Sequence, residues 1–77
     1  MTLVRYFAAA AEAAGTESED RTEATLDELR TAVLDEHPKL WFVLPDCAVL
    51  VDGVRTDGDA SLADARLIDV LPPFAGG

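Results

Sequence analysis

Three short β-rich stretches of the chain have the apolar pattern of strands. The first covers residues 2–7, where apolar residues flank Arg5. The second is residues 48–51, and the Asp52-Gly53 pair after it is a hairpin turn signal, so a short returning strand begins at Val54. The third covers residues 67–71 and is the last strand before a run of prolines.

A longer pattern between these strands has the period of an amphipathic helix. Its apolar residues recur every three or four positions and form one face for a sheet: Leu26, Leu29, Ala32 and Val33. Thr25 and Glu28 have the spacing of a capping box, with Thr25 as the N-cap and Glu28 reaching back. His37 falls in the last turn, and Pro38 ends the helix.

Three further segments have weaker patterns. Residues 8–14 are almost all alanine and predict a short helix that ends at Gly15. Residues 17–24 are highly polar, which suits an edge strand hairpinned to the first strand, with charges that deter edge-to-edge pairing. Residues 40–44 form a dense apolar run, and we expect Trp41 and Phe42 to lie in the core because so small a domain needs them inside.

These elements predict an α+β fold in a single domain, residues 1–77, with residues 72–77 as a flexible C-terminal tail. One main helix packs on a mixed sheet of four to five strands. If the first and last strands lie side by side in the middle of the sheet, the arrangement is the β-grasp of ubiquitin-like proteins, and the tail leaves from one end of the sheet.

Composition narrows the classes of partner and the compartment. The formal net charge is −9, from 15 acidic and 6 basic residues, so a nucleic acid would be repelled. No apolar run approaches the length of a membrane span, and residues 1–5 begin directly as a strand without the features of a signal peptide. We therefore expect a cytoplasmic protein that binds neither nucleic acid nor membrane.

The chain has one cysteine and one histidine, Cys47 and His37. An internal disulfide and a thiolate metal cage are excluded, and we expect no metal site, because a zinc site would have to consist mostly of carboxylates. Cys47 suits a small, half-buried apolar residue better than a persulfide carrier. His37 suits a helix-end residue interacting with the helix dipole better than a catalytic base. The clustered carboxylates at residues 17–20 and 57–59 suit solvated edges and turns.

The sequence ends in a tail that suits delivery of a terminal carboxylate. After Leu71, Pro72 and Pro73 cannot donate backbone hydrogen bonds and hold the chain extended. Phe74 is a large apolar side chain that suits a pocket on a partner. Ala75 precedes Gly76 and Gly77, which have no Cβ and can enter a channel too narrow for side chains. We expect Gly77, with Gly76, to carry the working group and residues 71–75 to bind a partner.

Several segments together resemble the MoaD/ThiS group of ubiquitin-like sulfur carriers, which includes the small subunit of molybdopterin synthase. The matching segments are Arg5-Tyr6-Phe7-Ala8, Ala11-Glu12-Ala13-Ala14-Gly15, His37-Pro38-x-Leu40, Val51-Asp52-Gly53 and Asp69-Val70-Leu71-Pro72-Pro73-Phe74-Ala75-Gly76-Gly77. The last is the most specific. Two positions depart from the group: Ala11 stands where arginine is frequent, and Ala65 stands where glycine is usual, which implies a different turn or local strain there.

The resemblance implies a mechanism and partners. An E1-like adenylyltransferase of the MoeB type would use ATP to adenylate the carboxylate of Gly77, and a sulfur donor would convert the acyl-adenylate to a thiocarboxylate. The tail would then enter a large subunit of the MoaE type and deliver sulfur in molybdopterin synthesis. The chain would bind no cofactor and would not be catalytic alone, since pocket and acid–base groups would come from the partner.

Other functions remain open on the sequence. The thiocarboxylate could instead serve cysteine, thiamine or transfer-RNA thiolation pathways, because sulfur carriers share this tail. The same tail could form an isopeptide bond to lysines of other proteins, as ubiquitin does. An interaction domain whose tail has no role is a third alternative.

Overall fold

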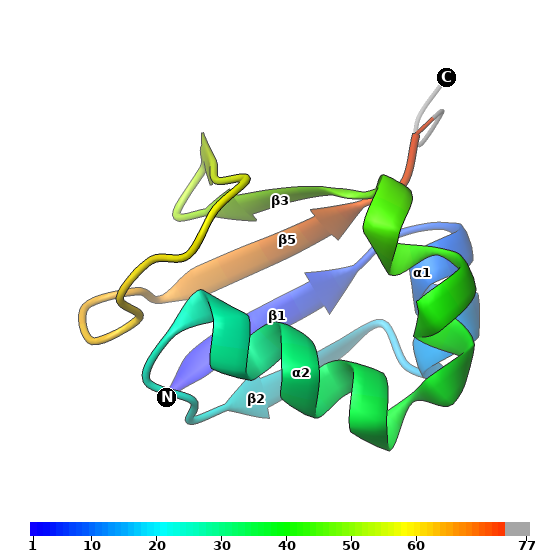
Figure 1. Ribbon diagram of the computed structural model, residues 1–77, viewed down its shortest axis with the longest axis horizontal. Coiled ribbons are helices and arrows are strands. Elements are labelled where there is room, and N and C mark those ends of the chain that lie inside the picture. The colour runs from blue at the N-terminus through cyan, green and yellow to red at the C-terminus, as the bar shows by residue number, and fades with distance from the viewer. Residues whose placement is uncertain (74–77) are drawn as a thin grey trace.

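The computed structural model describes residues 1–73 of the chain, which form a five-stranded mixed sheet in the order β2-β1-β5-β3-β4 (Figure 1). The strands are β1 (Thr2–Tyr6), β2 (Ser18–Arg21), β3 (Ala48–Val51), β4 (Val54–Arg55) and β5 (Leu67–Leu71). β1 and β5 are parallel neighbours in the middle, while β2 and β4 are antiparallel edges. The predicted central pairing of the first and last strands is therefore confirmed.

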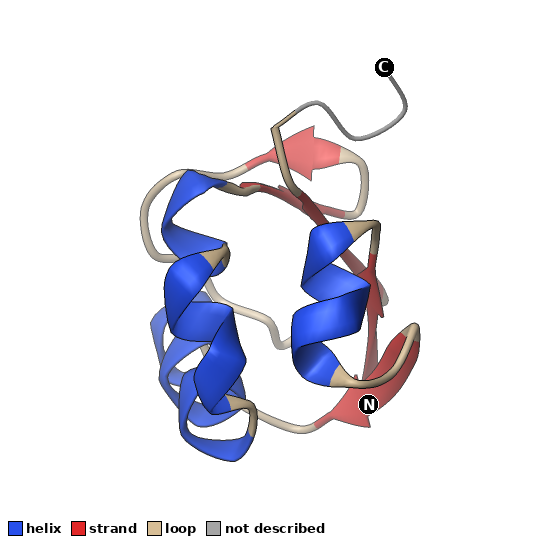
Figure 2. Ribbon diagram, turned by 90° about the vertical axis from the view of Figure 1, so that its right-hand side faces the viewer, coloured by secondary structure: helices blue, strands red, loops and turns tan. Residues whose placement is uncertain are grey.

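Within residues 1–73, all helices lie on one face of this sheet (Figure 2). They are α1 (Ala9–Ala14), α2 (Leu26–Glu36) and two 3₁₀ helices, η1 (Pro38–Phe42) and η2 (Leu44–Asp46). The α+β prediction with one main helix holds. No helix within residues 1–73 has both the length and the apolar character to cross a bilayer.

The core lies between α2 and the covered face of the sheet. Alternate residues of the central strands point into it, because successive side chains of a strand face opposite sides. The fully buried residues include Val4 on β1, Ile68 on β5 and Leu26 and Val33 on α2. Packing of this face fixes the register: Val4 is paired with Ile68, and a shift by one residue would turn apolar side chains to solvent.

Polar residues at its N-terminus hold α2 in place. The Thr25 hydroxyl accepts a hydrogen bond from the Glu28 amide at 3.2 Å, as the capping box predicts. The Glu28 carboxylate reaches one residue further than expected and accepts from the Ala24 amide at 3.3 Å. Asp59, from the loop before β5, accepts from the Asp27 amide at 2.8 Å. The helix start is thus tied to a segment that is distant in sequence.

Positive φ angles occur at four described residues. Gly15 ends α1 with φ 72°, and Asp52 and Gly53 form the β3–β4 turn with φ 48° and 84°, as both glycine signals predicted. Ala8, between β1 and α1, has φ 51° and ψ −125°, a backbone conformation that costs a residue with a Cβ about 1–3 kcal/mol. Ala65 is not among them, so the strain expected there does not take the form of a positive φ.

The prediction that Trp41 and Phe42 lie in the core is wrong. Residues 40–44 run from the end of the 3₁₀ helix η1 through Val43 to the first residue of η2. Leu40 is completely buried and Leu44 nearly so, whereas Trp41 is 63% exposed and Phe42 is 85% exposed. The core is closed by leucines and by the alanines of α1, so the two largest apolar side chains of this segment are left outside.

This placement predicts effects of very different size for two neighbouring residues. Leu40→Ala removes a buried side chain and should lower the free energy of unfolding by about 2–5 kcal/mol. Trp41→Ala removes an exposed side chain and should change it by less than about 1 kcal/mol. Urea unfolding followed by circular dichroism measures both. A larger loss for Trp41→Ala than for Leu40→Ala would contradict the described position of η1.

Candidate functional site

The candidate site begins where β5 leaves the sheet. Leu71 is half-buried, Pro72 is buried and Pro73 is exposed, so the first proline packs on the body and the second starts the exposed path. Phe74, Ala75, Gly76 and Gly77, which the sequence predicts as the binding and reactive residues, lie outside the described residues. The structure therefore defines the base of the tail.

The base of the tail is held on both sides. β5 pairs with β1 in parallel, with Tyr6 opposite Val70, and the Phe7 amide donates to the Val70 carbonyl at 3.2 Å. On its other edge β5 pairs with β3, where Leu71 lies opposite Ala48. Pro72 has no N–H to extend either ladder, so pairing ends there.

An ion pair joins the two central strands on the uncovered face. Arg5 Nε donates to Asp69 Oδ1 at 2.6 Å, and a second guanidinium nitrogen donates to Asp69 Oδ2 at 2.9 Å, so the pair is bidentate. The hydrogen bond that Arg5 donates to Asp69 raises the pKa of Arg5 above its ordinary value. The guanidinium carbon also lies 5.5 Å from the centre of the Phe7 ring, within the range of a cation–π contact.

Apolar side chains surround this ion pair on the same uncovered face. Leu3 and Phe7 are each 36% exposed. The neighbouring strands add half-buried apolar residues whose register places them on this face: Leu67 and Leu71 on β5, and Ala48 and Leu50 on β3. This face is continuous with the base of the tail, because β5 contributes to both. It is a candidate surface for a partner that takes the tail.

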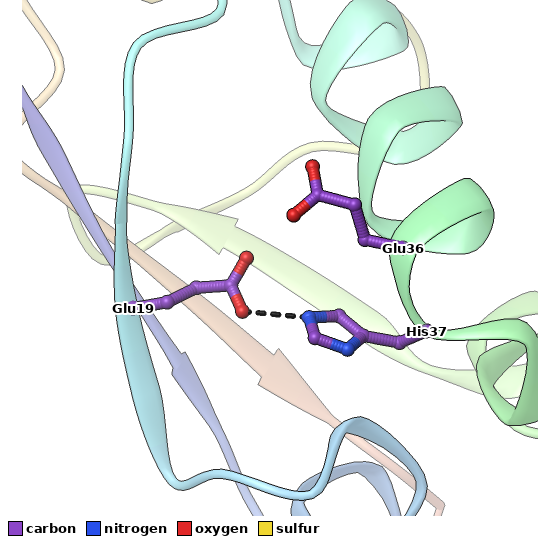
Figure 3. Close-up of side chains that lie close together, drawn as sticks. All are labelled: Glu19, Glu36 and His37. Carbon is purple, nitrogen blue, oxygen red and sulfur yellow. Dashed lines mark hydrogen bonds and ion pairs between the residues drawn. The ribbon is translucent and has the colours of Figure 1, made fainter.

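A second polar cluster, which the sequence did not reveal, joins the end of α2 to the edge strand β2 (Figure 3). His37 Nε2 lies 2.7 Å from a Glu19 carboxylate oxygen, and ligand atoms of Glu19, Glu36 and His37 lie within 4.8 Å of one another. Two carboxylates and an imidazole are donors that a divalent metal accepts. Arg21, however, already donates to Glu19 at 2.9 Å and to Glu36 at 2.7 Å.

Arg21 also donates two hydrogen bonds to Glu23, at 2.9 and 2.8 Å, so three carboxylates share its charge. These hydrogen bonds lower the pKa values of the Glu23 and Glu36 carboxyls. Because the carboxylates are already compensated, we interpret the cluster as a fastening between β2 and α2. His37, expected only to meet the helix dipole, is a cap residue with a specific carboxylate partner.

Cys47 lies just before β3 and is partly buried. Its thiol donates to the Val43 carbonyl with a sulfur–oxygen distance of 3.2 Å. Burial, and to a smaller extent the Asp46 carboxylate, raises the pKa of the Cys47 thiol. A raised pKa lowers the thiolate fraction, so these contacts favour a packing role over a reactive one.

Comparison with known proteins gives a family and a fold. The model of the ThiS family matches residues 4–77. A chain in the complex of subunits 1 and 2 of molybdopterin-converting factor from Helicobacter pylori 26695 is 31% identical, with a TM-score of 0.75 over 99% of this chain and 97% of that chain. SAMP1 from Haloferax volcanii is 24% identical, with a TM-score of 0.77 over 99% and 98% of the two chains. No match was found among curated protein sequences. The β-grasp prediction is confirmed.

The Tyr6 hydroxyl yields a prediction about stability and pH. Tyr6 is 3% exposed, and its hydroxyl has no hydrogen-bond partner among the described residues. Burial, then the Glu19 charge, raises the pKa of Tyr6 above its ordinary value of about 10, so the folded state holds the neutral form. The resulting stability is fully present below pH about 10 and is lost as the pH rises further, because the unfolded chain ionises first.

Tyr6→Phe should therefore be as stable as the wild type, or more so, at neutral pH, and should lose less stability above pH about 10. Urea unfolding at a series of pH values measures this, and tyrosinate absorbance reports the titration directly because the chain has one tyrosine. A loss of more than about 1 kcal/mol at neutral pH on removing the hydroxyl would mean that it has a partner.

Proposed function

The chain belongs to the ThiS family, and we propose that it is a sulfur-carrier protein whose working group is the C-terminal carboxylate of Gly77. The family match carries the proposal, because it extends through the final residue and so includes the diglycine. The geometry of the described residues is compatible with this proposal. The central strand β5 ends at the surface of the body, and an apolar sheet face adjoins that point.

The carboxylate must first become an electrophile. In the proposed sequence a carboxylate oxygen of Gly77 attacks the α-phosphorus of ATP in an E1-like adenylyltransferase of the MoeB type, and pyrophosphate leaves. Sulfur supplied by the donor at the oxidation level of sulfide then attacks the carbonyl carbon of the acyl-adenylate, AMP leaves, and a thiocarboxylate remains. Covalent activation of this kind divides one difficult substitution into two easier ones, and sulfur is a strong nucleophile in its thiolate form.

The partners supply the chemistry in this scheme. Within residues 1–73, the Cys47 thiol is hydrogen-bonded to a backbone carbonyl, and the His37 imidazole is hydrogen-bonded to the Glu19 carboxylate. Neither side chain is therefore arranged as a free nucleophile or base. We therefore propose that the chain is not catalytic alone and binds no cofactor. ATP and the sulfur donor are used by the activating enzyme.

Molybdopterin synthesis is the pathway we favour among the sulfur-transfer pathways. The relative at 31% identity is a subunit of a molybdopterin-converting factor and was solved in complex with its other subunit. By analogy, the tail of the present chain would enter a large subunit of the MoaE type. Gly76 and Gly77 would occupy the narrow part of that pocket, and Phe74 and Ala75 would contact its mouth, with residues 71–73 at the interface.

Intact-mass spectrometry tests the carrier chemistry. After incubation with its activating enzyme, ATP and a sulfur donor, the chain should gain the mass difference between one sulfur and one oxygen atom. Deleting Gly77 should abolish the gain without changing thermal unfolding, since residues 1–73 are untouched. A wild-type mass that never rises would refute the carrier, and diglycine remnants on lysines of other proteins without free thiocarboxylate would favour a protein modifier.

A further inference from the structure

Two adjacent aromatic side chains on η1, Trp41 and Phe42, are exposed without a role in the fold. Trp41 is 63% exposed and Phe42 is 85% exposed, while Leu40 in the same helix η1 is fully buried. The chain has five aromatic residues in all, so two of the five stand together in solvent. Large exposed apolar side chains that the core does not need are typical of contact surfaces.

This aromatic pair, Trp41 and Phe42, lies at the end of the molecule where the tail begins. Phe42 precedes η2, which leads through Cys47 into Ala48, and Ala48 is paired with Leu71. The 3₁₀ turns keep this path short, because they rise only about 2 Å per residue. Figure 1 shows the segment of η1 and η2, α1 and the start of the tail at the same end, with the β3–β4 hairpin at the other.

The length of the tail limits how far a partner can stand from the body. Gly77 lies four residues beyond Pro73, and four extended residues reach at most about 14 Å. An enzyme that holds the carboxylate of Gly77 must therefore bring its surface against the body near Pro73. A standard interface buries about 800 Å² on each partner, which corresponds to a disc of about 16 Å radius.

The body measures 30 × 25 × 19 Å along its principal axes. A disc of that size has a diameter of about 32 Å, which exceeds both of the shorter axes. A footprint that includes the start of the tail therefore reaches across this end of the molecule toward η1, while the β3–β4 hairpin with Val54 lies at the other end (Figure 1).

We infer that Trp41 and Phe42 form a docking contact for the adenylating enzyme that activates Gly77, an inference that rests on the proposed function. The pair is a small patch, and a contact of this size suits an enzyme that binds, modifies and releases better than a permanent subunit, whose interface is larger. Exposed aromatic residues contribute disproportionately to such contacts. Because sulfur carriers share the Gly-Gly end, a contact on the body would also let the enzyme distinguish this chain.

Steady-state kinetics of ATP-dependent pyrophosphate release tests the contact. The substrate is the full chain, and the enzyme is its E1-like adenylyltransferase. In the Trp41→Ser/Phe42→Ser double variant, KM for the chain should rise about tenfold or more while kcat stays within about twofold, because the carboxylate itself is unchanged. Val54→Ser is the matched control, since Val54 is 67% exposed at the opposite end, and its KM should not change.

The outcomes separate the docking contact from the carrier function. If the wild type is adenylated and the double variant has an unchanged KM, the docking contact is refuted and the carrier function stands. If Val54→Ser raises KM as much, the effect is not local and the contact is also refuted. A wild type that is never adenylated refutes both.

Two further results would assign the patch to another occupant and overturn the inference. A wild type that sediments as a dimer, with a monomeric double variant, would assign it to a second copy of the chain. Weaker binding to the large subunit alone, with an unchanged KM for adenylation, would assign it to that subunit. Circular dichroism of the double variant should match that of the wild type.

Discussion

The position of β5 between β1 and β3 determines where the chain leaves the body. Both edges of β5 are hydrogen-bonded, so its end cannot move without breaking two ladders. The Arg5–Asp69 pair adds a bidentate link between the two central strands. The ladders stop at Pro72, which has no N–H and is buried against the body. Five residues follow Pro72, so the reach of Gly77 from this fixed exit is short.

The two faces of the sheet differ in what covers them. One face carries α2 and the core, and the cluster of Glu19, Arg21, Glu36 and His37 fastens the end of that helix to the edge strand. Apolar side chains are exposed on the other face and at the end of the molecule where the tail begins. A domain of this size would gain stability by burying them. This distribution suits a body that positions a reactive end for other proteins and supplies little chemistry itself.

Much of the fold could be predicted because local and global signals agree: the capping box at Thr25, the Asp52-Gly53 turn and the final strand all formed as the sequence indicates. The exposure of Trp41 and Phe42 could not be predicted, because apolarity alone does not indicate which side of a 3₁₀ turn packs on the core. The contact between Glu19 and His37 joins residues 18 positions apart and has no local signature. The Arg5–Asp69 pair did have a sequence signal, because one apolar strand contains a positive charge and the other contains a negative charge.

Adding one phenylalanine after Gly77 tests most directly whether the carboxylate of Gly77 is the working group. The extension leaves the body unchanged but moves the carboxylate by about 3.5 Å and places a side chain where the diglycine has none. The extended chain should unfold at the same temperature as the wild type and should acquire no sulfur from the activating enzyme, ATP and donor. An extended chain that retains its added residue by mass and still acquires sulfur as fully as the wild type would contradict the account.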